Sequence, residues 1–251
     1  MTRDEALTLR YAAGSDVGQR RSENEDSAYA TAHLLAVADG MGGHAAGEVA
    51  SALAIAAMEA LDNRLAETGR ADVDLVEELA AGVADAAERL DRRVAEDPAL
   101  TGMGTTLTAM LWAYPSFALA HVGDSRGYLF RDGELTQLTR DHTMVQTLVD
   151  QGRMPAELAA RHPSRSVLVR ALMAGSPGEP DLSLHTARPG DKYLLCSDGL
   201  TDVATAEDLS TVLGRAADPE EAVHQLIDLA NEGGGPDNIT CVVAEVSSPS
   251  S

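Results

Sequence analysis

The order of helices and strands constrains the fold of this chain more than any other feature. Two stripes of apolar residues at helical spacing stand next to each other, over about 44–67 and 72–96. Strand-like runs then follow one another over 105–138 through short turns, including Asp132-Gly133, a dipeptide typical of tight hairpins. Strands that alternate with single helices would indicate a parallel sheet, whereas paired helices and consecutive hairpins predict an antiparallel α+β domain.

The rest of the chain fits the same plan, apart from one segment. Two strands are expected before the helices, at 7–13 and 27–38, the second with a bend at His33. Residues 141–178 contain two short helical patterns, and we interpret this segment as an excursion from the sheets. Further strands are expected at 182–186, 193–196 and 239–246, and further helices after the capping box Thr205-Ala206-Glu207-Asp208 and from Asp218-Pro219.

Composition and charge exclude several classes of function. The 251 residues are 44% hydrophobic, which is ordinary for a globular domain, and they carry a formal net charge of −21. Nucleic acids and anionic membrane surfaces are recognised by basic patches, so we expect neither as a partner. No apolar run approaches the ~20 residues that span a bilayer. Both cysteines, Cys196 and Cys241, lie inside apolar runs, a pattern that favours buried thiols and a cytoplasmic location.

Four aspartates lie where strand-like apolar runs meet turns. Asp39, Asp124 and Asp198 each follow such a run, and Asp237 precedes one. A single aspartate at a strand end is usually a turn residue, but four in the same setting are less easily explained by turns alone. Carboxylates at the ends of different strands can converge on one point, and a cluster of oxygen ligands favours hard cations such as Mg²⁺ or Mn²⁺. This pattern predicts a metal-dependent hydrolase of phosphate esters.

A charged segment near the N-terminus, residues 15–26, contains candidate residues for binding phosphate. Arg20 and Arg21 precede a group of carboxylates by a few residues. A solvated loop is the simpler interpretation of Arg20 and Glu23. The functional interpretation is that one arginine grips a phosphate with its planar fork of donors, while one carboxylate holds a metal or its water.

Six short sequence motifs follow one another along the chain. The set of six in this order identifies a protein family far more specifically than any single motif does. The six motifs are Arg21-Ser22-Glu23-Asn24-Glu25-Asp26, Asp39-Gly40-Met41-Gly42-Gly43-His44, Gly102-Met103-Gly104-Thr105-Thr106, Gly123-Asp124-Ser125-Arg126, Ser197-Asp198-Gly199-Leu200 and Gly235-Pro236-Asp237-Asn238. Over about 9–246 the chain thereby resembles the PPM family, the metal-dependent (type-2C) serine/threonine protein phosphatases, in its bacterial subtype.

The resemblance implies a fold that agrees with the order of helices and strands. It implies an α+β sandwich of two antiparallel β-sheets, flanked on both sides by helix pairs (α-β-β-α), with a small helical flap. The excursion at about 141–178 corresponds to that flap. Because the chain shows no internal repeat and no long linker, we expect a single phosphatase catalytic domain over 1–251, with a short polar tail at 247–251.

The resemblance also implies roles for individual residues at a site with two metal ions, Mn²⁺ or Mg²⁺. Asp39 matches the carboxylate that bridges the two ions, and the Gly40 carbonyl matches a further contact. Asp198 and Asp237 match ligands of the first ion. Glu25 matches a carboxylate near the second ion that acts through water.

Further roles concern the phosphate and a third ion. Arg21 matches the arginine that binds phosphate, and Asp26 matches a supporting residue. Bacterial relatives often bind a third ion, for which Asp124 and Asp198 match the carboxylates and Ser166 matches a backbone contact.

The implied mechanism leaves the general acid open. Two ions that share a carboxylate lower the pKa of a bridging water, and the resulting hydroxide attacks phosphorus in line. Eukaryotic relatives carry His two residues after the bridging aspartate, where this chain has Met41. His44 is the nearby candidate for protonating the leaving group. A metal-bound water is the alternative, and His44 is then a residue at the start of a helix.

We expect the substrates to be phosphoserine and phosphothreonine in proteins, so that the enzyme opposes serine/threonine kinases and meets them among its partners. Two alternatives remain open. One is a metallo-phosphoesterase that acts on a non-protein ester. The other is an inactive member that only binds partners, and the presence of Arg21 and the four aspartates argues against it.

Overall fold

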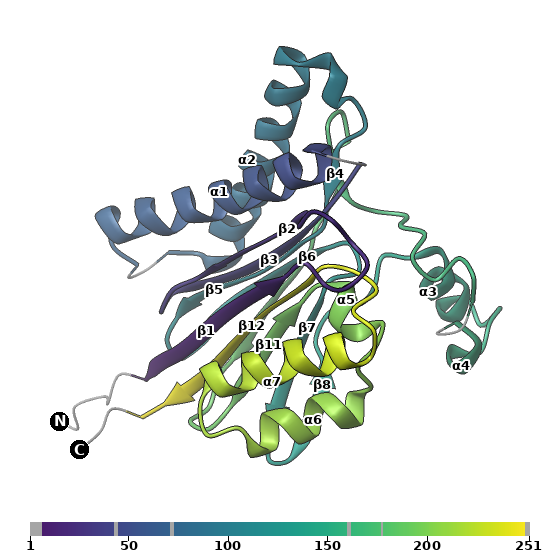
Figure 1. Ribbon diagram of the computed structural model, residues 1–251. Coiled ribbons are helices and arrows are strands. Elements are labelled where there is room, and N and C mark those ends of the chain that lie inside the picture. Colours follow the sequence, from purple (N-terminus) through teal and green to yellow (C-terminus); the bar gives the residue numbers. More distant parts are fainter. Residues whose placement is uncertain (1–6, 43–44, 71–72, 160–161, 177, 249–251) are drawn as a thin grey trace.

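The structure is a computed structural model that describes residues 7–42, 45–70, 73–159, 162–176 and 178–248. Two β-sheets stack face to face, and helices cover the outer face of each sheet (Figure 1). The layers therefore run helix, sheet, sheet, helix. The predicted α+β sandwich of two antiparallel sheets is confirmed.

Within the described residues, one sheet has five strands in the order β1, β12, β11, β7, β8, and all neighbours are antiparallel. The strands are β1 (Thr8–Asp16), β7 (Arg126–Arg131), β8 (Glu134–Gln137), β11 (Lys192–Cys196) and β12 (Ile239–Ser247). The first and last strands pair over nine residues, from Thr8 opposite Ser247 to Asp16 opposite Ile239. Ser247 thus belongs to a strand, and residues 249–251 of the expected tail lie outside the described residues.

The second sheet has seven strands in the part of the chain that the structure describes, in the order β10, β6, β5, β3, β4, β9, with β2 paired to β3. The strands are β2 (Asp26–Ala30), β3 (Leu34–Met41), β4 (Gly104–Thr105), β5 (Leu107–Ala113), β6 (Ser116–Val122), β9 (Leu172–Met173) and β10 (Asp181–Thr186). The single bent strand predicted at 27–38 is wrong, because β2 and β3 form a hairpin. Thr31 closes that turn, since its Oγ1 accepts hydrogen bonds from the backbone of His33 and Leu34 at 3.2 and 3.0 Å.

Two helix pairs cover the sheets. The long helices are α1 (Ala45–Thr68), α2 (Leu75–Glu96), α6 (Ala206–Arg215) and α7 (Pro219–Glu232), and the short ones are η1 (Pro98–Leu100) and α5 (Asp198–Thr201). The predicted capping box is confirmed, because Thr205 and Asp208 bond each other's backbone at the start of α6. Asp218 caps α7, which carries Pro219 at its first position as predicted.

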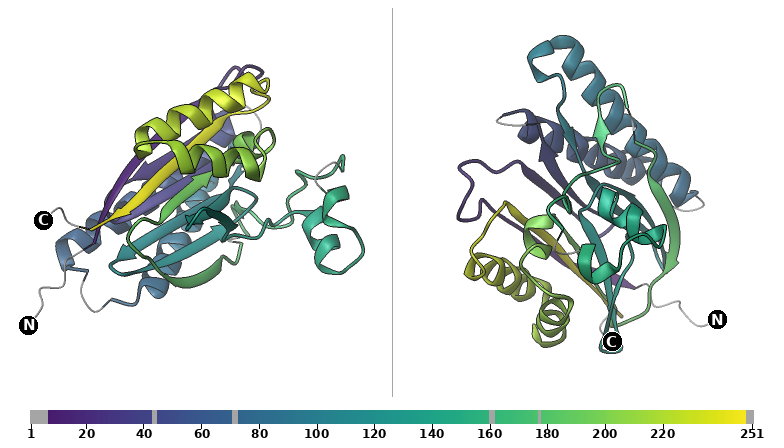
Figure 2. Two further views of the ribbon diagram at one scale, coloured as in Figure 1. Left: turned by 90° about the horizontal axis from the view of Figure 1, so that it is seen from below. Right: turned by 90° about the vertical axis from the view of Figure 1, so that its right-hand side faces the viewer.

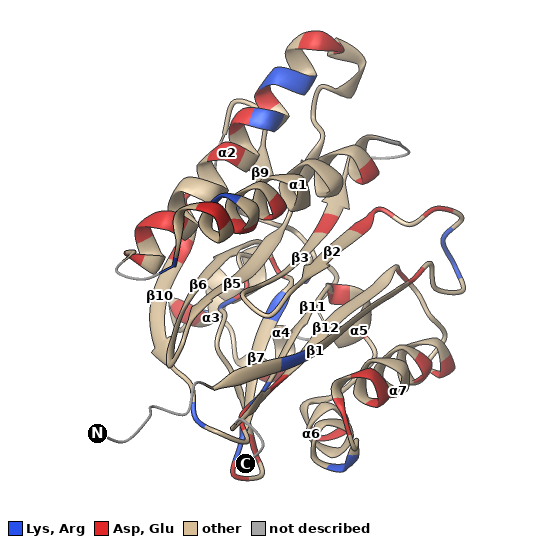
Figure 3. Ribbon diagram, turned by 90° about the vertical axis from the view of Figure 1, so that its left-hand side faces the viewer, with Lys and Arg blue, Asp and Glu red and all other residues tan. Residues whose placement is uncertain are grey.

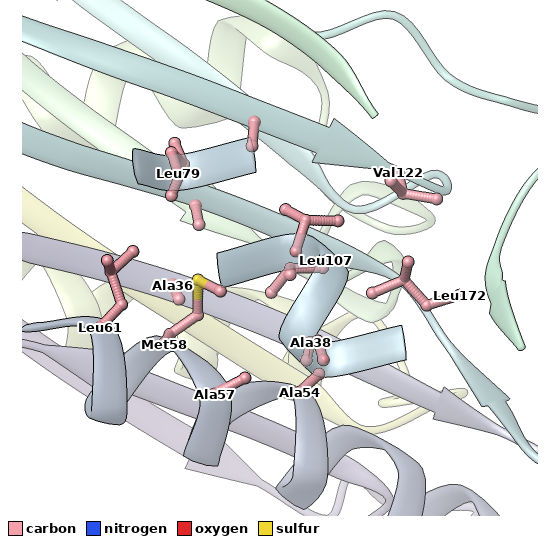
Figure 4. Close-up of a cluster of buried hydrophobic side chains, with 14 of the residues drawn as sticks. Ala36, Ala38, Ala54, Ala57, Met58, Leu61, Leu79, Leu107, Val122 and Leu172 are labelled. Atoms are coloured by element: carbon pink, nitrogen blue, oxygen red, sulfur yellow. The ribbon is translucent and has the colours of Figure 1, made fainter. Parts of the chain in front are cut away.

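The hydrophobic core has three layers, one under each helix pair and one between the sheets. In the first layer Met58 and Leu61 of α1 pack against the face of β3 that carries Ala36 and Ala38 (Figure 4). Small alanines on that face let the helix lie close to the sheet. The layer between the sheets contains Trp112, Phe117 and Tyr193, and Trp112 is completely buried.

The first part of the segment 141–178 lies outside the sheets, as expected, whereas Leu172–Met173 within it forms strand β9 of the second sheet. Helices α3 (Met144–Asp150) and α4 (Ala156–Ala159) stand away from both sheets, on the side of the short helix α5 (Figures 1 and 2). We call the segment 141–178 the flap. Within its described residues, Thr143 caps α3 by accepting a hydrogen bond from the Gln146 amide.

Both cysteines are buried free thiols, as predicted, and they lie opposite each other on β11 and β12. Burial raises the pKa of the Cys196 thiol to about 12, so this group is no nucleophile. Among the helices of the described residues, none is both long enough and apolar enough to cross a membrane.

Candidate active site

The fold brings the four aspartates to one cleft of about 450 Å³ at the ends of the sheets. Asp39 lies in β3, Asp124 follows β6, Asp198 begins α5, and Asp237 precedes β12. The cleft is lined by Arg21, Glu25, Asp39, Gly40, Met41, Gly42, Thr106, Asp124, Ser166, Leu168, Asp198, Asp202 and Asp237. Figure 3 shows acidic residues at the ends of β2 and β3, with basic residues in the loop that joins β1 to β2. The expected convergence of carboxylates is thus observed.

Hydrogen bonds from two threonines fix the backbone of Asp39. The Asp39 amide donates to Thr106 Oγ1 at 2.9 Å, and the Asp39 carbonyl accepts from the Thr106 amide and from Thr105 Oγ1, both at 2.9 Å. Both threonines are buried. Thr106 Oγ1 also contacts Ser125 Oγ at 2.7 Å, next to Asp124 in sequence. These threonines therefore connect the backbone of Asp39 to the turn that carries Asp124.

Glycines let the start of α1 approach the end of β3. A Cβ on Gly40 would lie 2.1 Å from the Gly47 carbonyl oxygen, and one on Gly47 would lie 2.9 Å from the Gly40 carbonyl carbon. Neither distance is tolerable, so this approach requires glycine at both positions. It places Glu25 and the Gly40 backbone side by side at the cleft, where the Gly40 amide donates to the Glu25 carbonyl at 3.1 Å.

Arg21 faces the carboxylates across the cleft. Its guanidinium donates to Asp237 Oδ2 at 2.6 Å and lies 3.9 Å from Glu25 Oε2. Nearly half of the Arg21 side chain is exposed, at 47%. The group is therefore accessible to an anion that enters the cleft, and such an anion competes with Asp237 for its donors.

Asn238 organises the loop that carries Arg21 and Glu25. Its Nδ2 donates to the carbonyls of Val17 and Glu23, both at 2.9 Å, and its Oδ1 accepts from the Glu25 amide at 2.9 Å. This buried side chain thus binds three points of a loop more than 200 residues away in sequence. In the sequence Asn238 stands out only as the last residue of Gly235-Pro236-Asp237-Asn238, and its role in holding this loop was missed.

Crowding and burial raise the pKa of several carboxyl groups in the cleft. Burial, together with the nearby carboxylates, raises the pKa of Asp39 and of Asp198 well above the usual range. Burial raises the pKa of Asp124 to about 7, helped by Asp141 and opposed by Arg126. Asp26 lies behind the cleft, where burial raises its pKa to about 6 although Ser197 Oγ donates to it at 2.7 Å.

These observations fit a site for divalent cations. The donors are oxygens, which suit Mg²⁺ and Mn²⁺, and an added cation would offset the burial and the mutual repulsion that raise the carboxyl pKa values. Within the described part of the chain, no three Asp, Glu, His or Cys side chains form a ready-made cluster for one ion. Asp237 is instead turned to Arg21, so a cation that binds Asp237 takes the place of that guanidinium.

Two described residues of the flap, Ser166 and Leu168, line one side of the cleft. Ser166 lines both the cleft and an adjoining cavity of about 230 Å³, which shares Asp124, Asp198 and Asp202 with it. An ion pair fastens this part of the flap to the end of α5, because Arg165 Nη2 lies 2.5 Å from Asp202 Oδ2. Of the expected site residues, only His44 lies outside the described residues.

Comparison with known proteins places this fold and site. The sequence profile of one family, described as protein phosphatase 2C, matches this chain. That profile matches residues 18–231. The chain belongs to the protein phosphatase 2C family, as the resemblance to type-2C phosphatases predicted.

Individual relatives agree with this assignment. The chain is 56% identical over 242 residues to the serine/threonine protein phosphatase PstP of Mycobacterium tuberculosis, a match that covers 96% of the chain and 45% of PstP. It therefore spans about half the length of that relative. It is 35% identical over 240 residues to the serine/threonine phosphatase stp of Listeria monocytogenes, covering 92% of the chain and 93% of stp.

A solved structure is also closely similar. The catalytic domain of PstP in complex with two manganese ions matches with a TM-score of 0.88 and 52% identity, over 96% of this chain and 99% of that one.

Proposed function

We propose that this chain hydrolyses phosphoserine and phosphothreonine in proteins, using divalent cations held by the acidic cleft. One observation carries the proposal: a single cleft combines Asp39, Asp124, Asp198 and Asp237 with an accessible Arg21. The names of the Mycobacterium and Listeria relatives support protein phosphate as the substrate. The manganese ions of the PstP structure support Mn²⁺ as a cofactor, and Mg²⁺ has the same preference for oxygen ligands.

The residues around Asp39 would hold the cations. Asp39 is the proposed bridge between two ions, because Thr105 and Thr106 fix its backbone on both sides. The Gly40 carbonyl, Asp198 and Asp237 complete the proposed ligands.

Other carboxylates would act around these ligands. Glu25 would act through a water, and Asp26 supports the cleft from behind through Ser197. Asp124, Asp198 and the backbone of Ser166 are the proposed contacts of a third ion.

The reaction needs a nucleophile, stabilisation of charge and a proton for the leaving group. Divalent cations in this cleft would supply a water of lowered pKa and positive charge beside the phosphoryl oxygens. Arg21 would bind those oxygens, exchanging its bond to Asp237 for bonds to phosphate. His44 is the proposed proton donor, with water as the alternative.

We also propose a domain organisation, partners and a compartment for this protein. We interpret residues 1–251 as one catalytic domain with a flap at 141–178. Phosphorylated proteins, including serine/threonine kinases, are the proposed partners. The buried free thiols of Cys196 and Cys241 support a reducing compartment such as the cytoplasm.

Replacing Asp39 tests the proposal. We expect Asp39→Asn to unfold cooperatively on heating, as a folded domain does. Its kcat/KM should fall by more than the roughly 100-fold loss that follows removal of a residue that only hydrogen-bonds a metal ligand. The assay is phosphate release from a phosphothreonine peptide and, in parallel, from p-nitrophenyl phosphate. Near-normal turnover by Asp39→Asn on the peptide would refute the role of the cleft. Activity of the wild-type chain on the small ester alone would select a non-protein substrate.

A further inference from the structure

His142 lies at the root of the flap and has no role in the site described above. It follows β8 and precedes α3, and it is only 3% exposed. It does not line the acidic cleft. A buried histidine of this kind is often only a packing residue, but its contacts connect three parts of the chain.

His142 and Gly123 bond each other reciprocally. The Gly123 amide donates to His142 Nδ1 at 3.1 Å, and the His142 amide donates to the Gly123 carbonyl at 2.7 Å. Because Nδ1 accepts a hydrogen bond from an amide, the ring is the neutral tautomer with its proton on Nε2. Burial lowers the pKa of His142, in keeping with a neutral ring.

The other ring nitrogen fixes this tautomer. His142 Nε2 lies 3.1 Å from Asp181 Oδ2, and Arg170 Nη1 donates to Asp181 Oδ1 at 2.9 Å. Asp181 begins β10, so the ring is held between a strand of the sandwich and the turn after β6. Such a carboxylate partner sets which nitrogen accepts and how the ring is oriented.

The turn at Gly123 depends on such contacts. Gly123 has a φ of +113°, and a Cβ there would lie 2.5 Å from Thr106 Cγ2, so no side chain of its own can anchor the turn. The next residue is Asp124, which is 9% exposed and lines the cleft. The direction of the Asp124 carboxylate therefore follows the orientation of the Gly123 peptide.

His142 also joins the start of the flap to its later residues, Leu168 and Val169. The Val169 amide donates to the His142 carbonyl at 2.8 Å, and Thr143 and Leu168 form a β-bridge beside it. Leu168 and Ser166 line the cleft. One residue thus connects the turn that carries Asp124 to the segment that carries Ser166.

We propose that His142 is a positioning residue, which orients Asp124 through the Gly123 amide and couples that carboxylate to the root of the flap. The proposal rests on the proposed function, because it assumes that Asp124 binds a divalent cation. Loss of the Nδ1 contact leaves the Gly123 amide free to rotate, and metal affinity falls without loss of any ligand.

Two substitutions separate the contacts of the ring. Asn places an oxygen near the position of Nδ1, so His142→Asn keeps an acceptor for the Gly123 amide and loses the bond to Asp181. Gln reaches the position of Nε2, so His142→Gln keeps a donor to Asp181 and loses the acceptor. His185→Gln is the control, since His185 contacts Ser183 on β10 and lies outside the cleft.

The primary readout is Mn²⁺ binding by isothermal titration calorimetry, with thermal unfolding of the metal-free proteins measured alongside. We expect His142→Gln to weaken the weakest Mn²⁺ site by about ten- to a hundredfold, and His142→Asn and the control to stay within about threefold of wild type. Equal affinities for the two His142 variants would overturn the proposal. The proposal would also be overturned if the Mn²⁺ affinity of both variants fell in proportion to their loss of thermal stability.

Hydrogen exchange in metal-free protein separates this proposal from the proposed function. The proposal predicts that the amide of Gly123 exchanges faster in His142→Gln than in His142→Asn. If wild type binds no Mn²⁺, the proposed function fails and the exchange result still decides whether His142 holds the turn. Equal protection of the Gly123 amide in both variants would overturn that assignment.

Discussion

Replacing Asp124 with Asn should stabilise the metal-free protein at neutral and alkaline pH. Burial raises the pKa of Asp124 from 3.8 to about 7, so the native state binds a proton that the unfolded state releases. Stability from this proton is complete below about pH 4 and is lost as the pH rises through about 7. The asparagine side chain carries no charge at any of these pH values, so this loss is absent from Asp124→Asn.

The expected gain in stability follows from the rise in the pKa of Asp124. A rise of about three pKa units corresponds to about 4 kcal/mol at 1.36 kcal/mol per unit. Water entry and movement of side chains relieve part of the burial, so we expect a gain of about 2–4 kcal/mol at pH 8 and almost none at pH 4. Mn²⁺ should reverse the order, because wild type gains binding energy that the variant lacks.

Urea unfolding of EDTA-treated protein at pH 4, 6 and 8 measures these differences. Asp228→Asn, on the exposed face of α7, is the control for a change of one charge. The reasoning is refuted if Asp124→Asn is no more stable than wild type at pH 8, or if the difference in stability between the two proteins does not grow between pH 4 and pH 8.

Two further predictions concern the phosphate contact and the core. Arg21→Ala should raise the KM for a phosphothreonine peptide by about tenfold or more with a smaller change in kcat, since a charged hydrogen bond contributes about 1.5–3 kcal/mol, and steady-state kinetics with an unchanged KM would exclude Arg21 as the phosphate ligand. Trp112→Ala should cost about 3–5 kcal/mol in urea unfolding, because Trp112 is fully buried and stacks on Phe117 at 4.4 Å, and a loss below about 1 kcal/mol would contradict the packing.

The sequence predicts those parts of the fold that local patterns determine. Paired helices, hairpins and helix caps follow from periodicity and turn residues, and these are confirmed. The turn at Thr31 was missed because it contains no glycine or proline, and the hydroxyl of Thr31 reverses the chain instead. The two-residue strands β4 and β9 are too short to show any periodicity.

For the candidate site too, the sequence predicts the features that local patterns determine and misses those that arise from contacts between distant segments. The positions of the four aspartates at strand ends were sufficient to predict their convergence. The contacts of Asn238 with the loop of Glu25, and of Thr106 with Asp39, join residues far apart in sequence, so no local pattern contains them. The bond between Arg21 and Asp237 is likewise a product of the tertiary fold.

The most direct test of the account is a Mn²⁺ titration of metal-free protein that follows bound metal and turnover in the same samples. Equilibrium dialysis gives the ions bound per chain, and release of phosphate from a phosphothreonine peptide gives the rate. We expect no turnover in EDTA, and a rate that rises with metal occupancy until at least two ions are bound per chain. Turnover in EDTA, or full activity of Asp39→Asn at the same Mn²⁺ concentration, would contradict it.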